Sequence, residues 1–273
     1  MTMPERTMVR VDEKPQPRWT RWLDLGDRSL AVLLLAPAAI LLSLIIVYPV
    51  ARLVYTSFFS LSLTSGLPAE FIGFENYTAM FDDPIFWETT WNTVLITLIT
   101  VPGALFMGLG LALLANLPFS MQWPMRLSLL IPWALPLSFA GLIFAWFFHY
   151  EYGVVNDVLN RLGFEGIIWF NSPNWAFAAI CLTIIWKTSS FMALMILVVA
   201  LIFRTITALQ TFDIPYMMTG GGPGTSTTTL AMYIHQNTVS FLDLGYGSAL
   251  AVMMFALSMC VTAVYLRIIR TKD

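Results

Sequence analysis

Two cations inside apolar segments are the residues of this sequence best placed to do chemistry. Lys187 follows the run WAFAAICLTIIW, and Arg204 follows a second apolar run. A cation at the centre of a membrane helix costs about 2.5 to 3.5 kcal/mol on insertion scales, so each must face a polar interior, reach water or find a partner. Two interpretations have equal weight: a polar wall of a translocation cavity, and a tie between helices.

The other ionisable residues do not favour catalysis. The acids scatter over the polar segments without a Ser, Cys or His partner at a recognisable spacing. An enzyme acting within the membrane would need a His or a pair of acids inside an apolar segment, and these segments have neither. The Gly-rich stretch at 220–224 lacks the Lys-Ser/Thr that follows a nucleotide-binding loop, so it predicts a flexible turn instead. We predict no catalytic residue and no metal site.

Composition defines the elements that position these residues. Of 273 residues, 58% are hydrophobic and 11% charged, and the mean hydropathy is +0.75. An ordinary soluble domain has about a quarter charged residues. The sequence therefore predicts an all-α integral membrane protein.

Four apolar segments are long enough to cross a hydrocarbon core of about 30 Å. They are Leu30–Val50, Trp91–Ala115, Leu127 to about Phe148, and Leu244–Leu266. Within the second, three small residues lie near one face at helical spacing, which predicts close helix packing in lipid. These residues are Gly103, Gly108 and Gly110.

The distribution of Lys and Arg predicts the orientation. Residues 1–28 carry six, and the segment after 266 carries three. The segments 51–88 and 151–174 carry one each, as does the turn at 116–126. We therefore expect both termini in the cytoplasm, which requires an even number of spans.

The apolar region from Trp175 to Phe212 does not fit a simple count of spans. Its 38 residues contain no Gly or Pro. Two crossings need about 40 residues plus a turn, whereas one helix of this length would measure about 57 Å. The region is therefore too short for two spans with a turn and too long for one span.

The sequence resembles the permease subunits of carbohydrate-uptake-type ABC importers, relatives of the maltose and glycerol-phosphate permeases. The resemblance covers nearly the whole chain and rests on the order and spacing of several short elements. These are Tyr48-Pro49-Val50, Phe74-Glu75-Asn76-Tyr77, Pro132-Trp133 with Pro136, Trp186-Lys187, Phe191-Met192, Phe212-Asp213, Thr219-Gly220-Gly221-Gly222-Pro223, Ser226-Thr227 and Gly245-Tyr246-Gly247-Ser248-Ala249-Leu250.

The chain departs from this family at one place. Such permeases have six spans, and a cytoplasmic loop with an EAA motif between spans four and five docks into the ATPase subunit. This sequence contains no Glu-Ala-Ala, and Leu197 joins directly to a stretch that resembles the middle of span five. We prefer the interpretation that the chain is a spliced or truncated form of a longer parent; a natural deletion is the alternative.

The resemblance implies three domains: a cytoplasmic tail at 1–28, the transmembrane domain at 29–268 and a cytoplasmic tail at 269–273. It implies a multi-pass protein of the bacterial inner membrane that imports a sugar, glycoside, polyol or glycerol-phosphate-like solute by alternating access. The alternatives are a permease for a non-carbohydrate solute, a membrane-embedded enzyme and a scaffold.

The partners that the resemblance implies are a second homologous permease, two ATP-binding subunits and a periplasmic or lipid-anchored solute-binding protein. No cofactor is expected in this chain, since ATP and Mg would be bound by the ATPase subunits. No nucleic-acid partner is expected.

Spans three to six of such permeases line the solute path, and aromatic faces, amides and charges there suit a sugar. The candidates for the solute path are Trp133, Trp186, Lys187, Arg204, Gln210 and Tyr216. The candidates for contact with the binding protein are Phe74, Asn76, Tyr77, Asp213, Thr219, Gly221 and Pro223.

Two structural expectations follow. The segments 55–88, 151–174 and 214–243 are external, so cysteines placed at Ser65, Asn156 and Ser226 should be labelled from outside the cell. If the chain is a spliced form of a six-span parent, spans four and five should be antiparallel, with a break or an implausible contact near Leu197–Val199. One continuous helix would contradict this.

Overall fold

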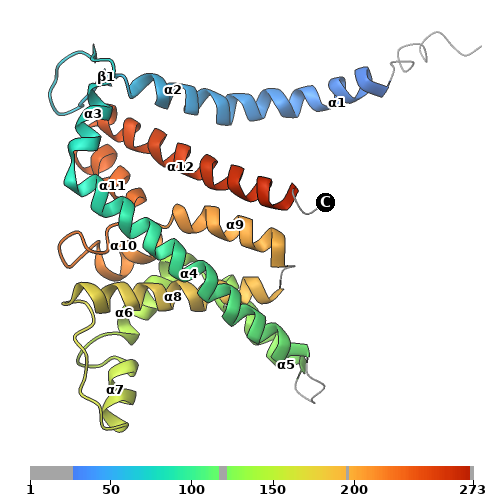
Figure 1. The fold of residues 1–273 in the computed structure, drawn as a ribbon, viewed down its shortest axis with the longest axis vertical. Coiled ribbons are helices and arrows are strands. Elements are labelled where there is room, and N and C mark those ends of the chain that lie inside the picture. Colours follow the sequence, from blue (N-terminus) through green and yellow to red (C-terminus); the bar gives the residue numbers. More distant parts are fainter. Residues whose placement is uncertain (1–26, 117–121, 195–196, 271–273) are drawn as a thin grey trace, which may run out of the picture. The chain divides into compact units, whose positions relative to one another are not determined.

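A computed structural model describes residues 27–116, 122–194 and 197–270. The described chain is almost wholly helical (Figure 1), and its only sheet is a two-stranded antiparallel pair. This confirms the all-α class. The elements are α1 (Asp27–Leu42), the π-helical turn η2 (Ser43–Val47), α2 (Tyr48–Thr56), β1 (Phe59–Ser60), β2 (Glu70–Phe71), α3 (Glu75–Asp82), α4 (Pro84–Asn116), α5 (Gln122–Ala134), α6 (Leu137–Phe147), α7 (Val154–Arg161), α8 (Pro173–Leu194), α9 (Leu197–Leu209), α10 (Asp213–Thr219), α11 (Leu230–His235), the π-helical turn η3 (Gln236–Ser240) and α12 (Leu244–Arg270).

Contacts divide the chain into two units, residues 1–52 and 53–273. The three domains that we predicted have other boundaries and stay predictions.

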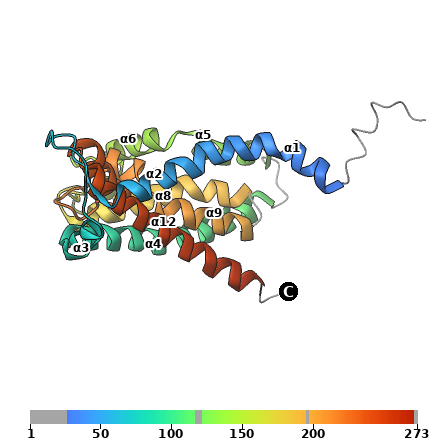
Figure 2. The same ribbon diagram turned by 90° about the horizontal axis from the view of Figure 1, so that it is seen from above.

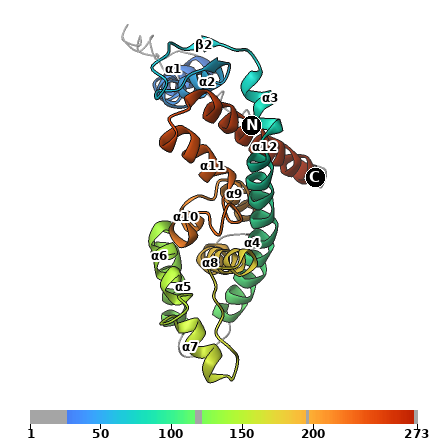
Figure 3. The ribbon, with the colours of Figure 1, turned by 90° about the vertical axis from the view of Figure 1, so that its left-hand side faces the viewer.

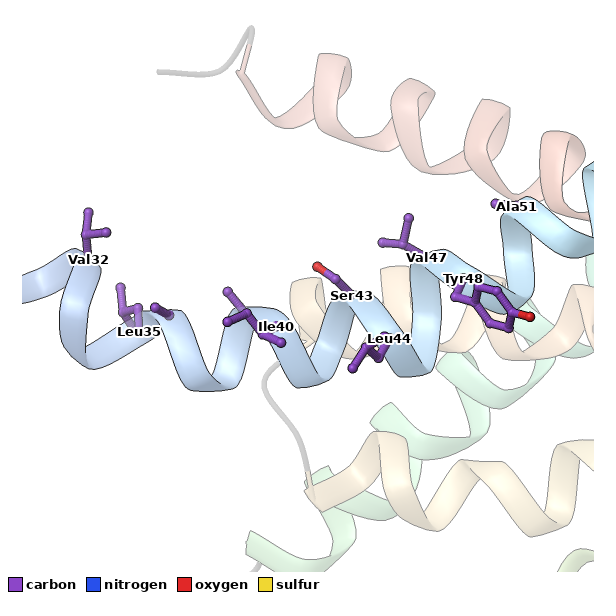
Figure 4. A pocket seen from close by; sticks show the side chains of 10 residues that line it. Val32, Leu35, Ile40, Ser43, Leu44, Val47, Tyr48 and Ala51 are labelled. Carbon is purple, nitrogen blue, oxygen red and sulfur yellow. The ribbon is translucent and has the colours of Figure 1, made fainter.

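The first unit contains the whole of the first predicted span, Leu30–Val50. Ser29–Thr56 forms 28 continuous helical residues, and none of its most apolar window is buried. One face of this helix carries a shallow apolar groove that runs from Val32 to Ala51 (Figure 4). A helix that is apolar on all sides suits a lipid environment.

In the second unit, three helices are long and apolar enough to cross a membrane: Pro84–Ala115, Pro173–Ala193 and Leu244–Tyr265. The third predicted span is not one straight helix. It consists of α5 and α6, which are bent by 100° at the break between Ala134 and Leu137. Pro136 explains the break, since proline has no backbone N–H and disfavours helical conformation of the residue before it.

Glycines bring α4 and α8 into close contact. A Cβ added at Gly108 would lie 2.6 Å from Cβ of Met192, and one at Gly103 would lie 2.6 Å from Cδ1 of Ile185. The predicted packing face is therefore confirmed at these two positions. The prediction is wrong for Gly110, because a Cβ there would meet nothing within 4 Å.

Helices α8 and α9 form an antiparallel hairpin that packs on α4 (Figures 1 and 2). The rings of Phe191 and Phe203, on either side of the junction, are 5.9 Å apart. The antiparallel arrangement is confirmed, and a single continuous helix is excluded. Leu197–Val199 form the start of the continuous helix α9, so the expected break does not lie at these residues; residues 195–196 lie outside the described part.

Helix α9 is short. Its 13 residues span about 20 Å at 1.5 Å per residue, less than the hydrocarbon core of about 30 Å. Among the described residues, four helices, or five counting the bent pair, meet the length needed to span. The described part thus lacks the full-length fifth span of a six-span parent.

The polar connections of the second unit gather at one end of its long helices. Figure 1 places the loop before α3, the segment around α7 and the segment from α10 to η3 at this end. Hydrogen bonds join two of them: Leu63 N–H donates to Leu242 C=O, and Leu244 N–H donates to Leu61 C=O. Figure 3 looks onto this end. All three segments are those that the Lys/Arg distribution predicts to be external.

Candidate functional site

The segment from Arg204 to His235 builds two pockets in the second unit. Helix α9 ends at Leu209, and α10 begins three residues after Gln210 with Asp213, an acid in the first turn, where the helix dipole favours negative charge. Helix α10 ends at Thr219 and is capped by Gly220, whose φ of 61° is the left-handed conformation typical of a glycine cap. The short helix thus carries side chains to both pockets.

The inner pocket, of about 80 Å³, lies between α6, α8, α9 and α10. It brings together three predicted site residues: Arg204, Gln210 and Asp213. Arg204 is only 7% exposed. Its Nη1 donates to Thr207 Oγ1 at 3.3 Å, while its Nε and Nη2 have no hydrogen-bond partner among the described residues. Asp213 Oδ1 accepts a hydrogen bond from Ser138 at 3.1 Å.

The outer pocket, of about 220 Å³, lies between α10, the Gly-rich turn and α11 with η3. Tyr216, a predicted site residue, lines it with Thr225, Thr228, His235 and Gln236. Hydroxyls, an amide and aromatic rings are the groups that suit a hydroxylated ring. His235 and Gln236 were not predicted as site residues, since neither belongs to a motif that carried the resemblance.

Phe212 connects the two pockets. It lines the inner pocket, and its ring stacks on Tyr216 of the outer pocket at 5.0 Å. His235 lies 5.1 Å from the same ring. The inner and outer pockets are therefore neighbours along α10.

Hydrogen bonds hold the Gly-rich turn against α4; the flexibility that we expected of this turn stays a prediction. The amide of Asn92 donates to the carbonyls of Thr225 and Thr228, each at 3.1 Å. Within the turn, Gly221 has φ of 97°, and a Cβ there would lie 2.4 Å from Thr228 Oγ1. Only glycine fits such a position. The turn itself is confirmed, and hydrogen bonds from the long helix fix the floor of the outer pocket.

Lys187 is a tie between helices. Its Nζ donates to the carbonyls of Pro132 and Trp133, the latter at 2.9 Å. These carbonyls lie near the end of α5, where Pro136 prevents the helix from continuing. Of our two interpretations, the contacts of Lys187 favour the structural one.

The two predicted tryptophans lie outside both pockets. Trp133 is 54% exposed. Trp186 is half-buried, with its ring 4.9 Å from that of Phe144. Their role in the solute path stays a prediction.

The candidates for binding-protein contact differ in exposure. Phe74 is exposed, whereas Asn76 is buried and donates to the carbonyls of Ser57 and Phe59. The hydroxyl of Tyr77 lies 2.7 Å from that of Ser57. These two residues shape the loop that presents Phe74, and their contact with a partner stays a prediction.

The remaining candidates lie along α10 and the turn. The hydroxyl of Thr219 bonds that of Thr227 at 2.7 Å, Gly221 is buried and Pro223 is half-buried. Among the described residues, the ring contacts of Phe74 are with Phe58 and Tyr77 and not with this segment.

One carboxylate and two tyrosines form a hydrogen-bonded cluster at the same end, which was not predicted from the sequence. Both Tyr233 and Tyr246 donate hydrogen bonds to Asp83 Oδ2, the second at 2.7 Å. Burial alone would raise the pKa of Asp83, but these bonds and those from the backbone N–H groups of Ile85 and Phe86 outweigh it and leave the pKa below its usual value. Burial and the neighbouring Asp83 raise the pKa of Tyr233 to about 12.

Comparison with known proteins identifies relatives along nearly the full chain, although no family model matches. The chain is 87% identical to the sulfoquinovosyl glycerol transport system permease protein SmoG of Agrobacterium fabrum, over 99% of this chain and 100% of that protein. It is 30% identical to the trehalose/maltose transport system permease protein MalF of Thermococcus litoralis, over 93% of this chain and 98% of that protein.

The fold is that of a solved transporter. A chain in the crystal structure of a bacterial alginate ABC transporter, in complex with an alginate pentasaccharide-bound periplasmic protein, aligns with a TM-score of 0.72 at 16% identity, covering 90% of this chain and 96% of that chain.

The alignment with the Agrobacterium protein is 308 positions long, at least 35 more than the 273 residues of this chain. That relative therefore has residues with no counterpart here. Despite this difference in length, the alignment covers 100% of the Agrobacterium protein. The described helices have the fold of the alginate transporter chain. The chain belongs to the family of permease subunits of ABC sugar-transport systems.

Proposed function

We propose that this chain is one of two permease subunits of a binding-protein-dependent importer, and that its solute is a sulfoquinovosyl-glycerol-like glycoside. The identity of 87% over the full length of the Agrobacterium permease carries the proposal. Such a solute combines a hydroxylated ring, a glycerol and an anionic sulfonate. The path must therefore accept hydroxyl groups and a negative charge.

The outer pocket supports a glycoside as solute. Its volume of about 220 Å³ holds one sugar ring better than a long chain, since whole drug-sized ligands occupy pockets of about 300 to 1,000 Å³. Tyr216 is 44% exposed, so its ring is free to stack on a sugar face. Thr225 and Gln236 line the same pocket and offer hydroxyl and amide groups.

The partners are a second permease, two ATP-binding subunits and a solute-binding protein. ATP and Mg are bound and ATP is hydrolysed in the ATP-binding subunits; this chain moves the solute. The periplasmic protein bound to the alginate transporter supports a binding-protein partner. Both termini lie in the cytoplasm, so the end that carries Phe74 and the Gly-rich turn faces the binding protein.

The coupling segment belongs between α8 and α9. The extra positions of the Agrobacterium permease are of the length of a docking loop, and α9 begins where such a loop would return to the membrane. Without it, the short α9 and the hairpin leave no cytoplasmic segment between spans four and five to contact the ATPase.

Site-specific cross-linking tests the orientation and the binding-protein partner. A photo-reactive residue at Phe74 of the assembled complex should cross-link to the solute-loaded binding protein. The matched control is Leu113, which is similarly exposed on α4 at the far end. Cross-linking at Leu113 in place of Phe74 would contradict the proposal.

A further inference from the structure

Arg204 has a buried charge that the described protein leaves unsatisfied. The side chain is 7% exposed, and two of its nitrogen atoms, Nε and Nη2, have no hydrogen-bond partner among the described residues. Its single hydrogen bond, to Thr207, is long at 3.3 Å. A buried ion without partners is unfavourable, so an unsatisfied group of this kind calls for an explanation.

No carboxylate in the described part neutralises Arg204. The one ion pair found there within 4.0 Å joins Arg161 and Asp157 on the exposed face of α7. Asp213 lines the same pocket as Arg204 but is not within ion-pair distance, and its Oδ1 accepts a hydrogen bond from Ser138 instead. The guanidinium is therefore available to a ligand.

The inner pocket is the smaller of the two. Its volume is about 80 Å³, against about 220 Å³ for the outer pocket. A polar void of this size has room for ordered waters or one compact oxyanion group, and the larger outer pocket suits a sugar ring better. The wall of the inner pocket adds the hydroxyl-bearing Thr188 and Thr211 and the amide-bearing Gln210 to the guanidinium.

Guanidinium geometry indicates which group fits. Nε and Nη2 form one edge of the planar fork, and this edge donates two parallel hydrogen bonds to two oxygens of one anion. These are the two unsatisfied atoms. A sulfonate, phosphate or carboxylate presents two such oxygens, whereas a sugar hydroxyl presents one.

We propose that the inner pocket is a subsite for the anionic group of the solute, with Arg204 Nε and Nη2 donating to two of its oxygens. The sugar ring then lies toward Phe212 and Tyr216 in the outer pocket. This inference rests on the proposed function and deepens it, because it requires the solute to carry a negative charge for efficient transport. Asp213, at the pocket wall, disfavours solutes with a second negative charge there.

The competing explanation is a pair between Arg204 and Asp213 in another conformation of the permease. Such a pair would make both residues structural and equally needed for stability. The subsite assigns them different roles, so the two explanations differ in the effect of replacing each residue alone.

Three matched glycosides test the subsite: sulfoquinovosyl glycerol, glucuronosyl glycerol and the neutral glucosyl glycerol. The protein is purified in its complex with the partner subunits, and binding is measured by titration of the melting temperature. In the unsubstituted complex, the sulfonate should bind more tightly than the neutral glycoside. Comparison with the carboxylate shows whether the subsite selects a sulfonate or any oxyanion.

Arg204→Gln should reduce binding of the sulfonate about tenfold or more, as loss of charge-assisted hydrogen bonds does, and leave the neutral glycoside unaffected. Without ligand, this variant should melt no lower than the original, since an unpaired buried charge is removed. Arg204→Lys, which keeps the charge but not the fork, should recover only part of the preference. Arg161→Gln on the exposed α7 is the control. It should change neither the binding of the sulfonate nor the melting temperature without ligand.

Preference for the sulfonate that survives Arg204→Gln would overturn the subsite. So would a large drop in melting temperature without ligand, shared by Arg204→Gln and Asp213→Asn, because that result indicates a structural pair. Equal binding of all three glycosides overturns the subsite and leaves the proposed function standing. Binding of none of them, with no uptake of any, overturns the proposed function and the subsite together.

Discussion

At the scale of single residues, several polar side chains of this permease join helices to one another or to the Gly-rich turn. Asp83 connects the start of α4 to α11 and α12 through Tyr233 and Tyr246, and Asn92 connects α4 to the Gly-rich turn. Lys187 connects α8 to α5. Arg204 is a charged residue that does not do this, since the described residues leave its Nε and Nη2 unsatisfied.

Replacing Asp83 with Asn should destabilise the protein in a pH-dependent way. The pKa of Asp83 is lowered from 3.8 in the folded state, so its stabilisation is fully present above pH 3.8 and is lost as the pH falls through the lowered pKa. Hydrogen bonds to charged groups contribute about 1.5 to 3 kcal/mol. The melting temperature of Asp83→Asn should therefore be lower at pH 7 and should approach that of the original protein as the pH falls through the lowered pKa of Asp83.

Asp82→Asn is the matched control for this measurement. Asp82 is the exposed neighbour and ends α3, so its replacement should have little effect at either pH. Equal melting of Asp83→Asn and the original protein at pH 7 would show that the two tyrosines do not need the carboxylate.

At the scale of helices, hydropathy predicts the location of spans because lipid imposes one length on them. It predicts less well how a span bends or how far a contact extends. Pro132 and Pro136 were visible in the sequence, but the 100° bend depends on what α6 packs against. The small residues of α4 predicted the face that packs on α8, yet a Cβ at Gly110 would meet nothing within 4 Å. Residues distant in sequence, such as Asp83 and Tyr233, could not be paired without the fold.

Gly108→Val should loosen the contact between α4 and α8. Even a Cβ at Gly108 would lie 2.8 Å from the carbonyl oxygen of Ser189, and overpacking of this kind costs about 1 to 3 kcal/mol. Thermal unfolding of the purified complex should show a lower melting temperature.

Gly110→Ala tests the same helix without the contact. A Cβ has open space there, and alanine favours a helix over glycine by about 1 kcal/mol. This variant should melt at the same temperature or higher. If Gly108→Val melts as high as Gly110→Ala, close packing at Gly108 is not required.

At the scale of the whole molecule, the inner pocket was partly predictable and the outer pocket was not. Arg204, Gln210 and Asp213 lie within ten positions of one another, so one helix end brings them together. His235 reaches Tyr216 only because the intervening turn folds back on α4. Hydropathy also showed that the region from Trp175 to Phe212 is too short for two full membrane spans. The structure shows this as a hairpin of α8 with the short α9.

Cysteine labelling tests the orientation of the permease. Single cysteines at Ser65, Glu165 and Ser226 should react with an impermeant thiol reagent in intact cells, because the Lys/Arg distribution places these segments outside. Glu165 replaces Asn156, our initial choice, because Asn156 is 2% exposed and donates to two backbone carbonyls. Protection of a cysteine at Ser226, together with labelling near Thr271, would reverse the orientation.

Solute uptake with and without the coupling segment tests the account most directly. The Agrobacterium permease has at least 35 residues with no counterpart here, and a coupling segment of that length is inserted between Leu197 and Val198, at the start of α9. Each form is reconstituted in proteoliposomes with the partner subunits and the binding protein, and uptake of sulfoquinovosyl glycerol is measured. The restored form should show uptake that requires both ATP and the binding protein, and the unrestored form should show neither uptake nor stimulated ATPase activity. Equal uptake by the unrestored form, or no uptake by a fully assembled restored form, would contradict the account.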